Sequence, residues 1–155
     1  MPAMEIATEL GTILLRMHDD VAPTTAAHIA KLAAQGVYEG ACFYRSDFVI
    51  QMGAQRPDGS AIPNANAALA VNESQRGLSN TRGTAAVAHW DVPDCGNSEF
   101  FINLQDNAHL DSAYGGYAVF ASVALDDSAS WATVGAIRDA VLQGARPRVD
   151  GVRVS

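Results

Sequence analysis

The sequence predicts a mainly β domain in which an antiparallel barrel is closed by two α-helices. Short stretches rich in β-branched and aromatic residues recur along most of the chain, separated by turns rich in glycine, proline and asparagine. Helical patterns occur only twice, once near each end. Many short strands with one helix near each end fit a closed barrel, and two packed sheets with helices on one side are the competing architecture.

The first third of the chain predicts a strand pair followed by a helix. Strands are expected at Met4–Glu9 and Thr12–Met17, and Gly11 supplies the permissive backbone that the turn between them needs. Pro23 suits the first turn of a helix, because its missing N–H has no partner there in any case. The alanine-rich stretch that follows favours helix, and Gly36 is a natural stop.

The rest of the chain predicts short strands around one long loop, followed by a helix and a last strand. A long loop over residues 54–66 is expected from its glycine, prolines and asparagines. The helix runs from about Ser130 to Gln143, with apolar residues on one stripe. The strand-like segments are Phe43–Ile50, Thr84–His89, Glu99–Asn103, Ala118–Leu125 and Val149–Val154.

Composition and charge exclude several functional classes. The 155 residues are 48% hydrophobic, which fits a single domain over 1–155, and 17 acids against 10 bases give a net charge of −7. That charge argues against a nucleic-acid partner or a polybasic membrane surface. No apolar run reaches about 18 residues and no secretory leader is visible, so we expect a soluble, cytoplasmic protein. Cys42 and Cys95 are too few and too distant for a disulfide framework.

General searches for catalytic or metal-binding motifs find little. The four histidines, at positions 18, 28, 89 and 109, do not stand at metal-ligand spacing from one another. The chain contains no nucleophile elbow, phosphate-binding glycine loop or zinc-protease motif. We therefore expect neither a metal nor another cofactor, and a hydrolase is disfavoured because no nucleophile–base pair can be recognised.

Two segments concentrate unusual residues, FYRSDFVIQMG (43–53) and GTAAVAHWDVPDCGNSEFFINLQDNAHLD (83–111). The first sets Arg45 and Gln51 among apolar residues. Taken alone, Arg45 would be read as half of an ion pair with Asp47 at a strand end. In the second, Phe100 and Phe101 would point to opposite faces of one strand, and at least one of them into the core.

The two segments resemble the signature regions of the cyclophilins, the cyclosporin-binding class of peptidyl-prolyl cis-trans isomerases. The first resembles the family motif F-H-R-x-x-x-x-F-x-x-Q-x-G, shortened by two residues, and the second resembles G-T-x-x-M-A-N-A followed by S-Q-F-F-I. The stretch APTTAAHIAKLAAQGVYEG resembles the family's A-P-x-T-x-x-N-F and G-x-Y-x-G. The likeness covers about residues 5–125, and it implies an eight-stranded antiparallel closed barrel capped by two helices.

The resemblance implies rotation about X-Pro peptide bonds, whose barrier of about 18–20 kcal/mol comes from amide resonance. Twisting the amide restores the lone pair of the proline nitrogen, and a guanidinium aimed at that nitrogen stabilises the twisted state selectively. Arg45 matches the family arginine with this catalytic role. The substrate-binding positions that the resemblance implies are Phe48, Val49, Gln51, Ala88, His89, Trp90, Glu99, Phe101, His109, Leu110 and Tyr117.

The chain departs from the family pattern at several of these positions. Glu99 replaces the usual glutamine, and we hypothesise that its carboxylate pairs with Arg45. His109 replaces the tryptophan that many members use to bind cyclosporin, so weak cyclosporin binding is expected. Tyr117 replaces a histidine, and Trp90 either narrows the groove or anchors its loop.

Three functional hypotheses stay open at this stage. The first is an isomerase that assists protein folding, with proline-containing peptides and unfolded chains as partners and a monomer as the family default. The second is a proline-peptide binding module with low turnover, which Glu99 and the altered neighbours would allow. The third is a scaffold that uses the barrel surface, and its effect would survive the loss of Arg45.

Overall fold

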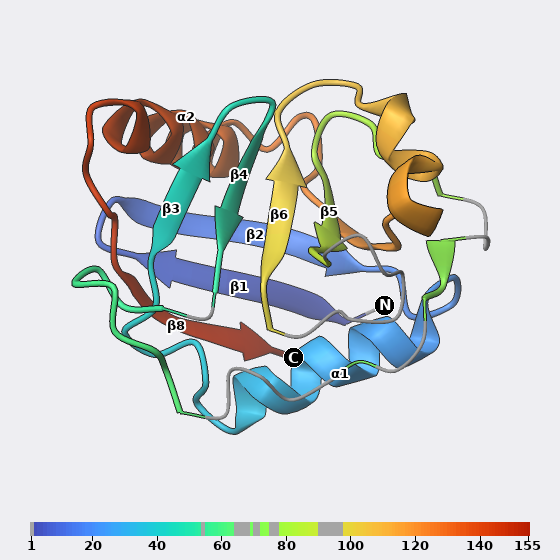
Figure 1. The fold of residues 1–155 in the computed structure, drawn as a ribbon, viewed down its shortest axis with the longest axis horizontal. Helices are drawn as coiled ribbons and strands as arrows, with labels where there is room; N and C mark the ends of the chain where they lie inside the picture. Colours follow the sequence, from blue (N-terminus) through green and yellow to red (C-terminus); the bar gives the residue numbers. More distant parts are fainter. Residues whose placement is uncertain (1, 54, 64–68, 70–71, 75–77, 90–97) are drawn as a thin grey trace.

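The computed structural model describes residues 2–53, 55–63, 69, 72–74, 78–89 and 98–155. Eight antiparallel strands form one sheet, in the order β3-β4-β6-β5-β7-β2-β1-β8 (Figure 1). The strands are β1 (Ala3–Thr8), β2 (Gly11–Met17), β3 (Phe43–Ser46), β4 (Val49–Met52), β5 (Thr84–Val87), β6 (Phe100–Asn103), β7 (Val119–Ser122) and β8 (Val149–Val154).

The sheet curls until its two edges meet. Cys42, next to β3, forms an antiparallel bridge with Arg148, next to β8. Two backbone hydrogen bonds flank this bridge, from the Phe43 N–H to the Pro147 carbonyl at 3.0 Å and from the Val149 N–H to the Ala41 carbonyl at 2.7 Å. This short contact nearly closes the sheet into a barrel, so the prediction of a barrel is confirmed and two separate packed sheets are excluded.

Two α-helices accompany the barrel, as predicted, and lie on opposite sides of it (Figure 1). Helix α1 (Pro23–Ala34) begins at its proline, and the chain leaves it through Gly36, whose φ of 74° few other residues adopt. Helix α2 (Ser128–Leu142) begins two residues earlier than predicted, because the Asp127 side chain caps it by accepting from the Ser130 N–H at 3.1 Å.

The strand predictions needed correction at their ends. The segment predicted as one strand from Phe43 to Ile50 is a tight hairpin of β3 and β4, in which the Asp47 N–H bonds the Val49 carbonyl at 2.9 Å. The strands β5, β6 and β7 are each shorter than their predicted segments. The outer residues of the β5 and β6 segments, Ala88, His89 and Glu99, line the pocket described below.

Side-chain alternation on the strands creates two separate apolar clusters. The larger cluster fills the barrel and includes Phe100 and Ile102 of β6. The smaller cluster lies on the other face of the sheet and consists of Val49, Ala86, Phe101, Leu110 and Val119. Two 3₁₀ turns, η2 (Ala108–Asp111) and η3 (Ala113–Gly115), pack beside it. The predicted opposition of the two phenylalanines is therefore confirmed.

A search of the described residues finds no helix with the length and apolar character that crossing a bilayer would require. In the same part of the chain, His, Cys, Asp and Glu side chains do not gather in groups of three that could hold a metal ion.

Candidate active site

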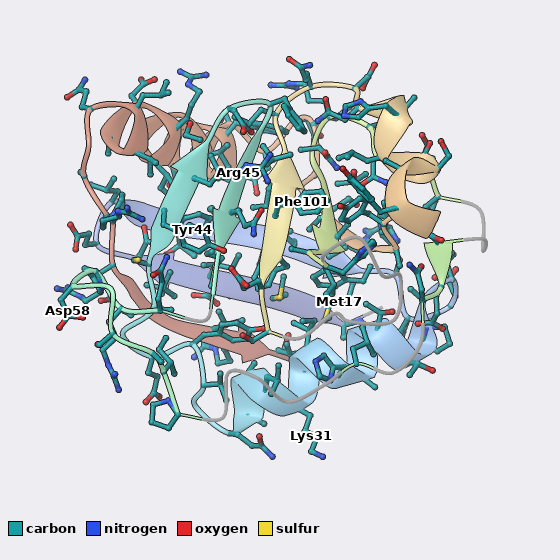
Figure 2. All side chains as sticks on the ribbon, in the orientation of Figure 1. Met17, Lys31, Tyr44, Arg45, Asp58 and Phe101 are labelled. Carbon is teal, nitrogen blue, oxygen red and sulfur yellow. The ribbon has the colours of Figure 1, made fainter. Side chains whose placement is uncertain are left out.

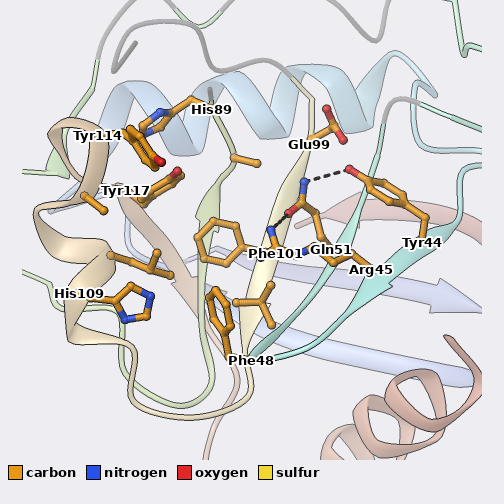
Figure 3. A pocket seen from close by; sticks show the side chains of 14 residues that line it. Tyr44, Arg45, Phe48, Gln51, His89, Glu99, Phe101, His109, Tyr114 and Tyr117 are labelled. Atoms are coloured by element: carbon orange, nitrogen blue, oxygen red, sulfur yellow. Dashed lines mark hydrogen bonds between the residues drawn. The ribbon is translucent and has the colours of Figure 1, made fainter. Parts of the chain in front are cut away.

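The smaller apolar cluster forms the floor of a pocket of about 500 Å³ on the outer face of the sheet (Figure 3). Eleven of the twelve site residues predicted from the sequence line it, and the twelfth, Trp90, lies outside the described residues. Three further residues that the sequence did not single out also line it. Among the described residues, the lining is Tyr44, Arg45, Phe48, Val49, Gln51, Ala88, His89, Glu99, Phe101, His109, Leu110, Ala113, Tyr114 and Tyr117.

The register of the sheet explains how residues from three strands meet in the pocket. Arg45 on β3 stands opposite Gln51 on β4, and Gln51 stands opposite Phe101 on β6. Directly opposed residues of antiparallel strands project their side chains from the same face. Arg45, Gln51 and Phe101 therefore form one row across the sheet, and Figure 2 shows Arg45 and Phe101 near each other on this side of the barrel.

The apolar end of the pocket is built from four side chains around Phe101. Phe101, Val49 and Leu110 are almost fully buried, with 3%, 1% and 9% of their surface exposed. Phe48, at the tip of the β3–β4 hairpin, meets the His109 ring edge-to-face at 5.4 Å between centroids. This arrangement leaves an aromatic-walled hollow that suits a small apolar ring.

Arg45 is held from three directions at the edge of this hollow. Its Nε donates to Asp47 Oδ2 at 2.9 Å, and its Nη1 donates to Gln51 Oε1 at 3.1 Å. Its guanidinium carbon lies 5.3 Å from the centre of the Phe48 ring, within cation–π range. Gln51 is fixed in turn because its Nε2 donates to the Tyr44 hydroxyl at 2.9 Å.

The hypothesis that Glu99 pairs with Arg45 is wrong. The described hydrogen-bond and ion-pair partners of Arg45 are Asp47 and Gln51. In Figure 3 the Gln51 amide, bonded to Tyr44, lies between the guanidinium and Glu99. The reason is the short hairpin, which brings Asp47 next to Arg45 and leaves Glu99 at the far side of Gln51. The simpler interpretation from the sequence, an ion pair with Asp47, is the one that the structure shows.

Glu99 lies just before β6 on backbone that is held by hydrogen bonds and a close glycine contact. The carbonyl of Glu99 accepts from the Ala88 N–H at 2.8 Å, and the Tyr38 hydroxyl donates to the carbonyl of Ser98 at 2.7 Å. Gly53 packs so closely that a Cβ at this position would lie 2.9 Å from the Glu99 Cα. Burial of the Glu99 carboxyl raises its pKa above the ordinary value, because the charged form is partly desolvated.

A stacked pair of rings forms the opposite wall. His89 and Tyr117 stack with their centroids 4.0 Å apart, and Tyr117 meets the edge of Phe101 at 5.6 Å. His89 Nε2 lies 2.7 Å from the carbonyl oxygen of Gly116, and this contact requires a proton on Nε2. Tyr114 completes the rim from a left-handed backbone conformation, with φ of 51°.

Three buried asparagines tie the walls of the pocket together beneath its floor. Asn103 Nδ2 donates to Asn80 Oδ1 at 3.1 Å, and Asn107 Nδ2 donates to Asn103 Oδ1 at 2.9 Å. Asn107 Nδ2 also reaches the Phe48 carbonyl at 3.1 Å, and Asn80 Nδ2 reaches the Tyr117 carbonyl at 3.1 Å. The network thus links the hairpin tip, the centre of the sheet and the aromatic wall.

Asp111 extends this network to the 3₁₀ turns. It accepts from the Asn80 N–H at 2.7 Å and from the Ser79 hydroxyl. Burial opposes ionisation of Asp111, but the hydrogen bonds from Ser79 and Asn80 and the nearby His109 outweigh it, so the pKa lies below the ordinary value. Asp111 is therefore ionised at neutral pH and fixes the segment that carries Leu110.

Sequence reasoning did not identify the asparagine network, Tyr44 or Tyr114 as parts of the site. Tyr44 was adjacent to Arg45 on a predicted strand, but alternation places neighbours on opposite faces. The β3–β4 ladder has an irregularity between Phe43 and Arg45, which turns Tyr44 toward Gln51. The asparagine contacts join residues 23 or more positions apart in several cases, and no local pattern signals them.

Comparison with known proteins agrees with this geometry. The family model for cyclophilin type peptidyl-prolyl cis-trans isomerases matches residues 3–155. A peptidyl-prolyl cis-trans isomerase of Acinetobacter baylyi is 37% identical over 77% of this chain and 65% of its own length. The peptidyl-prolyl cis-trans isomerase cyp18 of Streptomyces antibioticus is 36% identical over 79% of this chain and 77% of its own.

Solved structures show the same fold. A cyclophilin type isomerase of Cryptosporidium parvum, crystallised in the presence of the dipeptide Ala-Pro, superposes with a TM-score of 0.78. The superposition covers 99% of this chain and 98% of that one, at 18% sequence identity. With a matched family model over nearly all of its length and relatives above 35% identity, this chain belongs to the cyclophilin-type peptidyl-prolyl cis-trans isomerases.

Proposed function

We propose that the pocket is the active site at which this isomerase rotates X-Pro bonds, with Arg45 as the catalytic residue. The observation that carries the proposal is the guanidinium held at the edge of an apolar, aromatic-walled hollow. A proline ring seated in the hollow brings its nitrogen near the guanidinium. The planar amide nitrogen accepts a hydrogen bond poorly, whereas the twisted nitrogen accepts well, so Arg45 stabilises the twisted state over both planar ones.

The other lining residues position the substrate in this proposal. Phe48, Val49, Phe101 and Leu110 enclose the proline ring, and His109 closes the hollow beside Phe48. Gln51, held by Tyr44, presents its amide to a substrate carbonyl. The backbone at Ala88 and His89 binds the residues before the proline in extended form, with Tyr117 supporting the His89 ring. No proton is transferred and no cofactor takes part.

The proposed substrates are proline-containing peptides and unfolded protein chains, with a role in protein folding. The cyclophilin from C. parvum was crystallised in the presence of Ala-Pro, a dipeptide that contains an X-Pro bond. We further propose a single catalytic domain that works as a cytoplasmic monomer. Cyclosporin binding is weak in this proposal, because His109 stands where many relatives have tryptophan, and a nanomolar Kd would overturn that part.

The second candidate is a proline-peptide binding module with little turnover. The observation in its favour is the engagement of Arg45 by Asp47, since a strong pair would compete with the proline nitrogen. Both side chains are more than 40% exposed, however, and an exposed pair is worth only about 0–1 kcal/mol. Arg45 also has further N–H groups that neither Asp47 nor Gln51 uses.

Exchange of a short Ala-Pro peptide, followed by NMR, tests the proposal. The wild-type chain is compared with Arg45→Ala and with the matched control Arg138→Ala, an exposed arginine of α2 outside the pocket. We expect a fall of about 10²–10³-fold in kcat/KM for Arg45→Ala, the typical effect of losing a transition-state donor, and no change for the control. Wild-type binding without acceleration would establish the binding module instead.

A further inference from the structure

We propose that Glu99 makes this active site selective for peptides with a lysine or arginine two residues before the proline. The proposal rests on the function given above and names its substrate class. The pocket includes one carboxylate among its described lining residues, and it belongs to Glu99. The fixed positive charge on that lining belongs to Arg45, which already has Asp47 as its counter-ion at 2.9 Å.

The position of Glu99 follows from strand geometry. Phe101, the floor of the proline hollow, lies two residues further along the chain, and both side chains line the pocket. At about 3.3 Å per residue, the two positions are roughly 6.6 Å apart along the strand. An extended peptide rises by the same amount per residue, so a peptide with its proline over Phe101 has another residue two positions away beside Glu99.

The direction of the peptide follows from the proposed binding mode. The backbone at Ala88 and His89 binds the residues before the proline, and the Ala88 N–H is bonded to the Glu99 carbonyl at 2.8 Å. Glu99 therefore lies on the side of the pocket where the residues before the proline run. Figure 3 shows the Glu99 carboxylate beyond the Gln51 amide as seen from Arg45.

The backbone that carries the carboxylate is anchored on two sides. Gly53 touches the Glu99 backbone from β4, and Tyr38 anchors Ser98 from the core. An anchored backbone reduces the conformational freedom that this part of the site would lose when a cation binds to the carboxylate. The carboxylate is partly desolvated, as the raised pKa of Glu99 also indicates. Its electrostatic attraction for a cation is therefore stronger than that of a carboxylate on an open surface.

Matched peptides test the proposal. Three peptides differ only two residues before the proline, with lysine, glutamine or glutamate, and kcat/KM is measured for each in wild type, Glu99→Gln and Asp139→Asn. Asp139 is an exposed acid of α2 that changes the net charge equally and lies outside the pocket. We expect lysine to exceed glutamate by about tenfold in wild type and Asp139→Asn. In Glu99→Gln the ratio falls to within about twofold.

The ratio of kcat/KM between two peptides, measured on one variant, does not depend on the fraction of that variant that is folded. A partly unfolded Glu99→Gln sample therefore still reports the charge preference. A lysine preference that survives Glu99→Gln, or equal rates for lysine and glutamate in wild type, overturns the proposal. If wild type accelerates the glutamine peptide without any charge preference, this selectivity fails and the proposed function stands. If it accelerates none, the proposed function fails, and NMR titration of the same peptides decides the selectivity from their Kd ratios.

Discussion

Asn103→Leu is expected to destabilise the protein strongly, because Asn103 is the centre of the buried asparagine network. Leucine has nearly the shape of asparagine, so the substitution removes the hydrogen bonds with little change in packing. Asn103 is fully buried, and its side chain bonds Asn80 Oδ1, Asn107 Nδ2 and the Thr84 hydroxyl at 2.9–3.1 Å. The variant therefore removes four hydrogen bonds at once, because Asn103 Nδ2 also donates to the Thr84 carbonyl at 3.3 Å.

The size of the effect follows from what each partner loses. Asn80 Oδ1 keeps no other described donor, and Asn107 Nδ2 keeps only the Phe48 carbonyl. A buried polar group left without its partner costs about 1–3 kcal/mol. Thr84 adds little, because its hydroxyl still donates to the Thr81 carbonyl at 2.7 Å. Two such groups give a loss of about 2–6 kcal/mol, a large part of the stability of an ordinary domain.

Urea unfolding of wild type, Asn103→Leu, Asn107→Leu and the double variant measures this loss. If the asparagines act as one network, the double variant loses less than the sum of the two single losses, with a coupling of about 1–3 kcal/mol. The loss should be accompanied by slower X-Pro exchange at temperatures where the variant stays folded, because Asn107 holds the hairpin tip at Phe48. A loss below about 1 kcal/mol with additive effects would refute the reasoning.

Three further predictions concern the pocket. Asp47→Ala should change the free energy of unfolding by less than about 1 kcal/mol, because its ion pair with Arg45 is exposed. It should still lower kcat/KM about tenfold, because the guanidinium loses one of the contacts that orient it. Equal kcat/KM in variant and wild type would contradict this. Glu99→Gln should stabilise the fold at neutral pH, because the raised folded pKa means that ionised Glu99 opposes folding. That gain should vanish in urea titrations as pH falls from the folded pKa toward the ordinary glutamate value, and a gain that grows at low pH would contradict it. Gly53→Ala should lower the free energy of unfolding by about 1–3 kcal/mol, because φ is 112° at this position and the new Cβ would lie 2.9 Å from the Ser98 carbonyl oxygen. An unchanged thermal unfolding temperature would contradict this prediction.

Much of the fold could be predicted from local patterns, because strands and helices depend on residues close in sequence. The opposite directions of Phe100 and Phe101 follow from alternation alone, and the ends of α1 follow from Pro23 and Gly36. The strand order and the bridge that closes the barrel could not be derived in this way. The bridge joins residues 42 and 148, and the pairing of distant segments leaves no local pattern, so the closed eight-stranded barrel rested on family resemblance.

The candidate site also has features that the sequence predicts and features that only the three-dimensional structure reveals. Family motifs identified the residues around the pocket, but they did not identify which charged residues pair. Glu99 and Arg45 both line the pocket. The expectation that they belong to one site was the basis for the hypothesis that they form an ion pair. The register of β3 against β4 decides otherwise, because it places Gln51 directly opposite Arg45 and the hairpin turn places Asp47 beside it.

In the proposed mechanism, the short hairpin also explains how an exposed ion pair can serve catalysis without stabilising the fold. Arg45 receives an acceptor at Nε from Asp47, an acceptor at Nη1 from Gln51 and a ring face from Phe48. Each contact is weak by itself, since the arginine side chain is 42% exposed. Together they fix the guanidinium plane from three directions while leaving Nη2 without a described hydrogen bond within the chain. If Arg45 acts as proposed, a donor fixed in this way does not have to reorient when the proline nitrogen regains its lone pair, which is the condition for stabilising the twisted state selectively.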